Sequence, residues 1–160
     1  MRYSVFLFYL FCVLLAPQVR AAPAQQAFSD WQVTCNNQNF CLARNTGEHR
    51  GLVMTLTRSA GAKTDATLRI DLGGLDAPSV KEPEIAPRLL LDNVPLKLDK
   101  QRWQLTPWHL KTDDAATITA FLKNIQEGKA LTLRDGKQVI SLSGLKAALL
   151  FIDAQQKRVG

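Results

Sequence analysis

The sequence is poor in the residues that build metal sites and nucleophilic active sites. Its 160 residues include three cysteines and two histidines. The histidines, His49 and His109, are far apart and lack the spacing of metal ligands. No Gly-x-Ser-x-Gly pattern of a nucleophile elbow occurs, and Gly73-Gly74 lacks the strand–loop–helix surroundings of a phosphate-binding loop. We therefore expect neither a metal ion nor another cofactor.

Basic residues are not gathered into a patch. The formal net charge of +6 falls to about +4 without Arg2 and Arg20 of the N-terminal segment, and the C-terminal pair Lys157-Arg158 is the longest basic run after that segment. A nucleic-acid-binding surface would cluster such residues and interleave them with aromatic side chains. We predict no nucleic-acid partner and a mildly basic surface.

The one long apolar run lies at the N-terminus. Arg2 precedes Val5 to Ala16, a run of twelve residues that is too short to span a hydrocarbon core of ~30 Å as a helix. Val19 and Ala21 fit the −3 and −1 positions of a signal peptidase site. Residues 1–21 are therefore predicted to be a cleaved signal peptide, which is favoured over an uncleaved anchor. No later apolar segment is long enough for a membrane span, so we expect a periplasmic protein.

Export leaves two cysteines in the mature chain. Cys12 is removed with the signal, and Cys35 and Cys41 remain. A pair at short spacing in an oxidising compartment is most simply one disulfide. A redox-active pair is disfavoured because catalytic dithiols favour a two-residue spacer beside a helix N-terminus, whereas residues 36–40 form a polar turn.

Period-two alternation predicts strands through the first two thirds of the chain. Apolar residues alternate with polar ones around Trp31, Met54 and Ile70. Residues 22–27 are small and polar and are predicted to be a flexible leader. The predicted strands are 28–35, 40–44, 52–58, 67–72 and 103–105, with a hairpin formed by 88–91 and 96–98 around Asp92-Asn93.

The last third changes to a helical period. Ile118, Phe121, Leu122 and Ile125 follow an N-cap at residues 112–114 and precede Gly128. Asp135-Gly136 then joins strands 130–133 and 137–142. Ser143 is predicted to cap a second helix, whose stripe is Leu145, Ala148, Leu149 and Ile152. We predict an α+β, mostly β fold: an antiparallel sheet or sandwich, with two C-terminal helices flanking a β-hairpin, in one domain over 28–160.

Two sets of short motifs carry a family resemblance. The N-terminal set is Asp30-Trp31-x-Val33-x-Cys35, then Cys41, then a strand that ends in Arg58. The C-terminal set is Leu131-x-Leu133-x-Asp135-Gly136, Ile140-Ser141-Leu142-x-Gly144, Ala147-Ala148-Leu149 and Asp153-x-x-Gln156-x-Arg158.

Together these motifs resemble the exported proteobacterial family known as domain of unknown function 1176, and more distantly the invasion-associated locus B proteins. The resemblance covers most of residues 28–160. It implies a periplasmic, β-rich fold with a late helical segment, and it implies no reaction. Members are often longer than this chain, so the sequence leaves open whether the chain is cut short at Gly160.

Two groups of residues are candidates for a site. Trp103, Trp108 and His109 form either an exposed recognition surface or a lid on the core, and the usual burial of tryptophan favours the lid. Arg58 and Arg158 could capture an anion through a bidentate fork. The favoured alternative for these arginines is a structural ion pair, for instance with Asp153.

No assembled catalytic set is recognisable in the sequence. This favours a non-catalytic binding or interaction module, whose partner is an unknown periplasmic protein or envelope component. The alternative is a cell-envelope hydrolase that uses the loop histidine His109 with a nearby acid or serine. A third reading is a structural fragment of a larger protein.

Overall fold

A computed structural model describes residues 23–47, 51–61, 65–72, 89–106, 109–134 and 138–157. The large sheet consists of β1 (Ala24–Phe28), β2 (Trp31–Cys35), β3 (Cys41–Asn45), β4 (Leu52–Arg58), β5 (Ala66–Leu72), β9 (His109–Thr112) and β8 (Gln104–Leu105), in that spatial order. The small sheet consists of β11 (Val139–Ser141), β10 (Ala130–Leu133), β6 (Leu89–Leu91) and β7 (Val94–Pro95). The helices are α2 (Ala115–Ile125) and α3 (Leu145–Lys157).

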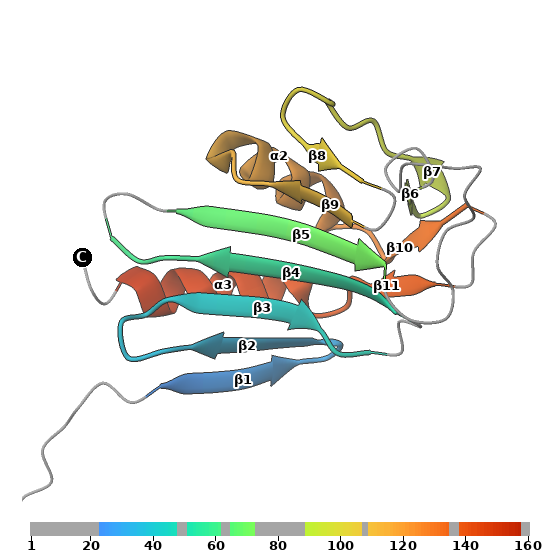
Figure 1. The fold of residues 1–160 in the computed structure, drawn as a ribbon. Coiled ribbons are helices and arrows are strands. Elements are labelled where there is room, and N and C mark those ends of the chain that lie inside the picture. Colours follow the sequence, from blue (N-terminus) through green and yellow to red (C-terminus); the bar gives the residue numbers. More distant parts are fainter. Residues whose placement is uncertain are drawn as a thin grey trace, which may run out of the picture.

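Every strand pairing is antiparallel, and both helices follow most of the strands in the chain (Figure 1). The strand pair β10–β11 lies between the two helices in sequence. The predicted fold class, a mostly β fold with two C-terminal helices flanking a hairpin, is therefore confirmed. The predicted turn at Asp135-Gly136 and the predicted signal peptide lie outside the described residues.

One hydrophobic core joins the two sheets and the two helices. The buried faces of β2, β4 and β5 contribute Trp31, Met54 and Ile70, each fully buried, as the alternating pattern predicts. Phe121 of α2 and Ile152 of α3 belong to the same cluster. The Trp31 indole Nε1 also donates a 2.8 Å hydrogen bond to the carbonyl oxygen of Ser141, which links the large sheet to the small one.

The predicted disulfide is confirmed. Cys35 and Cys41 face each other across β2 and β3, with Cα atoms 4.1 Å apart. The side chain of Asn36 accepts hydrogen bonds from the backbone N–H groups of Gln38 and Phe40, and Asn39 has a positive φ of 57°. We call residues 36–40 the disulfide turn.

The flexible leader predicted at residues 22–27 is wrong for most of its length. Residues 24–28 form β1, which pairs with β2 from Ala24, opposite Cys35, to Phe28, opposite Trp31. The Phe28 ring packs against Phe151, with centroids 5.4 Å apart. The sequence of this strand shows no alternation of apolar and polar residues. The strand forms because it pairs with the edge of β2 and because Phe28 contacts α3.

Two further details differ from the sequence predictions. Asp92 and Asn93 both have positive φ, so the hairpin turns within these two residues, and its second arm is Val94–Pro95 rather than 96–98. Helix α3 is capped at Gly144, because the carbonyl oxygen of Gly144 accepts the first helical hydrogen bond, from Ala148. The carbonyl of Ser143 instead accepts from the N–H of Asp30.

Candidate functional site

A groove of about 490 Å³ opens between α2 and the segment 94–99. One wall is the β6–β7 hairpin with the residues that follow it, and the other is one face of α2. We call it the α2 groove. Its apolar lining consists of Leu91, Val94, Pro95, Leu96, Leu98, Trp103, Ala120 and Phe121.

Two aromatic rings form the most deeply buried part of the lining. Trp103 is only 4% exposed, and its ring meets Phe121 edge-on, with centroids 5.1 Å apart. The indole therefore packs into the core while still lining the groove. Backbone hydrogen bonds from Arg102 and Trp103 to the carbonyl of Asp99 close the turn that positions this ring.

The wall that α2 provides is formed by residues spaced at the helical period. Thr117, Ala120, Phe121 and Asn124 stand at i, i+3, i+4 and i+7, so they share one face of the helix. Phe121 lies where this face meets the buried stripe, whereas Ala120 and Asn124 are exposed. The same helix thus supplies both core residues and the wall of the groove.

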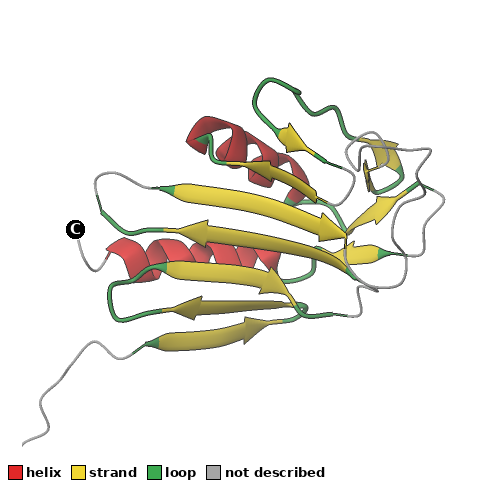
Figure 2. Ribbon diagram, in the orientation of Figure 1, coloured by secondary structure: helices red, strands yellow, loops and turns green. Residues whose placement is uncertain are grey.

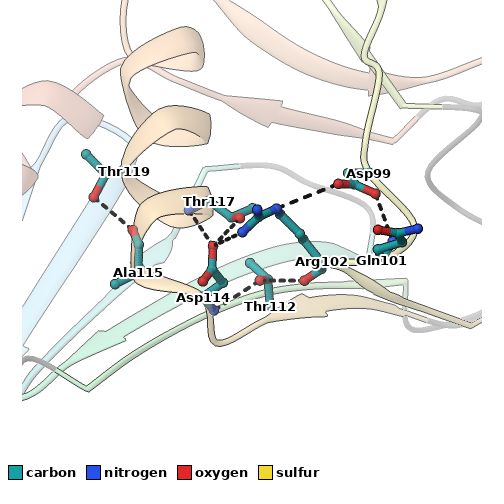
Figure 3. Close-up of polar contacts among 8 residues, drawn as sticks. All are labelled: Asp99, Gln101, Arg102, Thr112, Asp114, Ala115, Thr117 and Thr119. Carbon is teal, nitrogen blue, oxygen red and sulfur yellow. Dashed lines mark hydrogen bonds and ion pairs between the residues drawn. The ribbon is translucent and has the colours of Figure 1, made fainter.

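A network of polar contacts holds the end of the groove at which α2 begins (Figure 3). Arg102 lies 3.3 Å from the Asp114 carboxylate and 3.7 Å from that of Asp99. Asp114 caps α2 by accepting hydrogen bonds from the hydroxyl and backbone N–H of Thr117, at 2.5 and 3.0 Å. These two bonds, with a smaller contribution from Arg102, lower the pKa of Asp114 below its ordinary value. Because Asp99 and Thr117 line the groove, the network orients both walls.

The chemistry of the groove is that of a binding surface. Its polar lining is Lys97, Asp99, Thr117 and Asn124, and the described residues around it include no histidine, cysteine or serine. Val94, which lines the groove, is 64% exposed, so its side chain is open to a ligand. Across all described residues, no group of three His, Cys, Asp or Glu side chains is placed to hold a metal ion.

His109 lies elsewhere, on β9. Its Nδ1 is 3.2 Å from the hydroxyl of Thr106, which also accepts a hydrogen bond from the His109 backbone N–H at 3.1 Å. Asp71 is opposite His109 in the strand register, but its carboxylate accepts a 2.7 Å hydrogen bond from Arg69. In the part of the chain that the structure describes, Thr106 is the only hydrogen-bond partner of the imidazole.

Arg58 is occupied by contacts within the protein. Its guanidinium forms an ion pair with Asp153 and donates a 2.5 Å hydrogen bond to the side chain of Gln156. Gln156 in turn donates to the backbone carbonyls of Arg58, at 2.8 Å, and of Asn39, at 3.1 Å. These contacts hold the end of α3 against β4 and the disulfide turn. The other two candidates, Trp108 and Arg158, lie outside the described residues.

Comparison with known proteins identifies the family. A family model described as "Protein of unknown function (DUF1176)" matches residues 25–160. The chain belongs to this family. It is also 72% identical over 160 residues to "Uncharacterized protein YpfG" of Escherichia coli strain K12, and the whole chain spans 46% of the length of that relative. No solved structure matches the chain.

Membership confirms the first family resemblance drawn from the motifs, and neither matched description names a reaction or a ligand. In the described part of the chain, no helix is both long and apolar enough to cross a membrane.

The sequence alone identifies only part of the α2 groove. Trp103 is a candidate because tryptophan combines a large apolar ring with a polar edge. Ala120 and Asn124 are missed because single exposed residues on a helix carry no pattern. Leu96 and Leu98 alternate like a strand, although they lie beyond β7. Leu96 adds only one backbone hydrogen bond to β6, at Leu89, and both leucines line the groove, so this apolar pair is the signal that points to it.

Proposed function

We propose that this chain is a non-catalytic binding module of the cell envelope, and that the α2 groove holds an apolar segment of an envelope protein. The observation that carries the proposal is the groove itself, with an apolar lining of about 490 Å³ built on a helix face. Its rim carries charges of both signs, at Lys97 and Asp99. Such a rim complements a peptide, which offers backbone carbonyls and N–H groups beside its side chains.

The absence of an assembled catalytic set among the described residues supports binding rather than hydrolysis. A general base needs a proton donor within hydrogen-bond reach and a group that orients it. His109 has the hydroxyl of Thr106 and no described acid in that role. His109 is on β9, and no residue of β9 lines the groove.

The periplasmic location is supported by the signal-like N-terminus and by the disulfide. Cys35 and Cys41 are bonded, and disulfides persist in oxidising compartments. If residues 1–21 are removed on export, intact-mass analysis of the periplasmic fraction should give a chain that begins at Ala22 and resists thiol alkylation. Recovery of a chain that retains Phe8 to Leu15, or of free thiols at both cysteines, would contradict the location.

The groove is tested by blocking it. Ala120 is exposed on the groove face of α2, and arginine is a good helix former, so Ala120→Arg should fill the groove and leave the helix intact. Thr119→Arg adds the same side chain at the next exposed position, outside the groove. An envelope protein captured by the wild-type protein should be retained by Thr119→Arg and lost by Ala120→Arg.

The expected loss is at least about tenfold in affinity, because burying one leucine-sized side chain contributes about 1.5–3 kcal/mol. Circular dichroism should show the same melting curve for both variants. If both variants capture the same proteins as the wild type, or if the wild type captures none, the groove is not the binding site.

A further inference from the structure

The large sheet has an outer face that none of the described helices covers (Figure 2). Its side chains alternate with the buried ones of the core, and one row of them crosses the sheet in strict register. Arg44 is opposite Thr55, Thr55 is opposite Arg69, and Arg69 is opposite Lys111. Gln32 extends the row beyond Arg44, and Gln104 extends it beyond Lys111. We call these six residues the outer row.

The outer row carries three cations and only one acid partner. Arg69 pairs with Asp71 at 2.7 Å. Among the described residues, no carboxylate lies within ion-pairing distance of Arg44 or Lys111. Neighbouring strands lie ~4.8 Å apart, so Arg44 on β3 and Lys111 on β9 are about 14 Å apart across the sheet. The positive charge is thus spread along a line perpendicular to the strands.

A shallow hollow of about 340 Å³ lies over one end of the row. Gln32, Thr34, Leu42, Arg44 and Thr55 line it. The amide and hydroxyl groups both donate and accept hydrogen bonds, whereas the guanidinium only donates. Gln32 and Thr55 are half-buried and Arg44 is exposed, so these groups are open to a ligand on the surface.

We propose that the outer row binds an acidic polysaccharide laid across the strands. The cations complement its carboxylates, and the threonine and glutamine side chains complement its hydroxyl groups. An added peptide strand would pair with a sheet edge, not a face. An anionic membrane surface is bound by clusters of roughly four to eight Lys or Arg side chains, more than the outer row provides. None of the residues of the α2 groove belongs to the row, so this site is independent of the proposed function.

The test uses the exported protein and polygalacturonate, an acidic polysaccharide, in isothermal titration calorimetry at low ionic strength. Arg44→Gln/Lys111→Gln should weaken binding about tenfold, because each lost ion pair contributes up to about 1 kcal/mol. Lys123→Gln/Lys157→Gln removes the same charge from the two helices and should bind as the wild type does. Neutral dextran should not bind any of these proteins.

A second variant guards against loss of folding. Thr55→Glu places a carboxylate between Arg44 and Arg69 in the row, so it should preserve the melting temperature while it weakens polygalacturonate binding. The proposal is overturned if the wild type does not bind polygalacturonate, or if the two double variants lose affinity equally. It is also overturned if the row instead governs binding to phosphatidylglycerol vesicles or to polyglutamate.

Discussion

At the scale of single residues, Gly144 is a position that leaves no room for a side chain. It has a φ of +95°, and a Cβ atom there would lie 1.9 Å from the carbonyl oxygen of Phe28. The glycine lets the chain pass close to the end of β1 and start α3 directly afterwards. Because this clash would be with a backbone atom, no side-chain rotation could relieve it.

Gly144→Ala should therefore destabilise the protein severely. The left-handed backbone alone costs an alanine about 1–3 kcal/mol, and the clash with Phe28 adds to it. Gly61→Ala is the matched control, because Gly61 also has a positive φ, of +112°, but a Cβ atom there meets nothing within 4 Å. Chemical denaturation should show a much larger loss for Gly144→Ala, and equal losses would show that the close approach to β1 does not exist.

Asp114 should give the stability of the protein a dependence on acid pH. Its pKa is lowered in the folded state from the ordinary 3.8, first by the hydrogen bonds from Thr117. Its contribution is therefore complete above the ordinary pKa and is lost as pH falls through the lowered one, because the native state must then bind a proton. Asp114→Ala should melt at a lower temperature than the wild type at neutral pH, and the gap should narrow in acid.

The control for this titration is Asp113→Ala. Asp113 accepts one hydrogen bond, from the hydroxyl of Thr67, and does not cap the helix. The melting temperature of this variant should lie close to that of the wild type at neutral pH, because no helix cap is lost. A constant gap between Asp114→Ala and the wild type down to pH 2 would mean that the cap contributes no charge-dependent stability.

At the scale of elements, a strand can be predicted from the sequence when one of its faces is buried and the other is exposed. The strands β2, β4 and β5 alternate clearly because one face packs on the core and the other faces outward. The strand β1 has no such pattern, since its middle residues are exposed, and it forms because β2 offers an edge. The alternation of Leu96 and Leu98 also predicts a strand incorrectly, because these residues lie beyond β7 and line the groove.

The two helices are predicted to be integral to the fold rather than appended to it. Phe121 of α2 is 7% exposed and Ile152 of α3 is fully buried, both in the cluster that includes the large sheet. Phe121→Ala or Ile152→Ala should cost about 2–5 kcal/mol and still give a single unfolding transition. Lys123→Ala, on the exposed side of α2, should be nearly silent in the same thermal melts. Two separate transitions in either variant would mean that the helices unfold independently of the sheet.

At the scale of the whole molecule, the fold is easier to predict from the sequence than the site. The core follows from local periodicity, but the α2 groove needs the segment 94–99 to lie beside a helix that begins more than fifteen residues later. The outer row likewise depends on the register of several strands, from β2 to β9. Neither arrangement is encoded in any single stretch of sequence, and both become visible only when the chain is folded.

The most direct test of the proposed binding function is site-specific photo-cross-linking in cells that express the protein. A photoreactive phenylalanine analogue at Asn124 would project into the α2 groove, and the same residue at Thr119 would lie outside it. The groove as a binding site predicts one discrete adduct with an envelope protein from position 124, its absence from position 119, and its loss when Ala120→Arg is added. Equal adducts from both positions, or none from position 124, would contradict it.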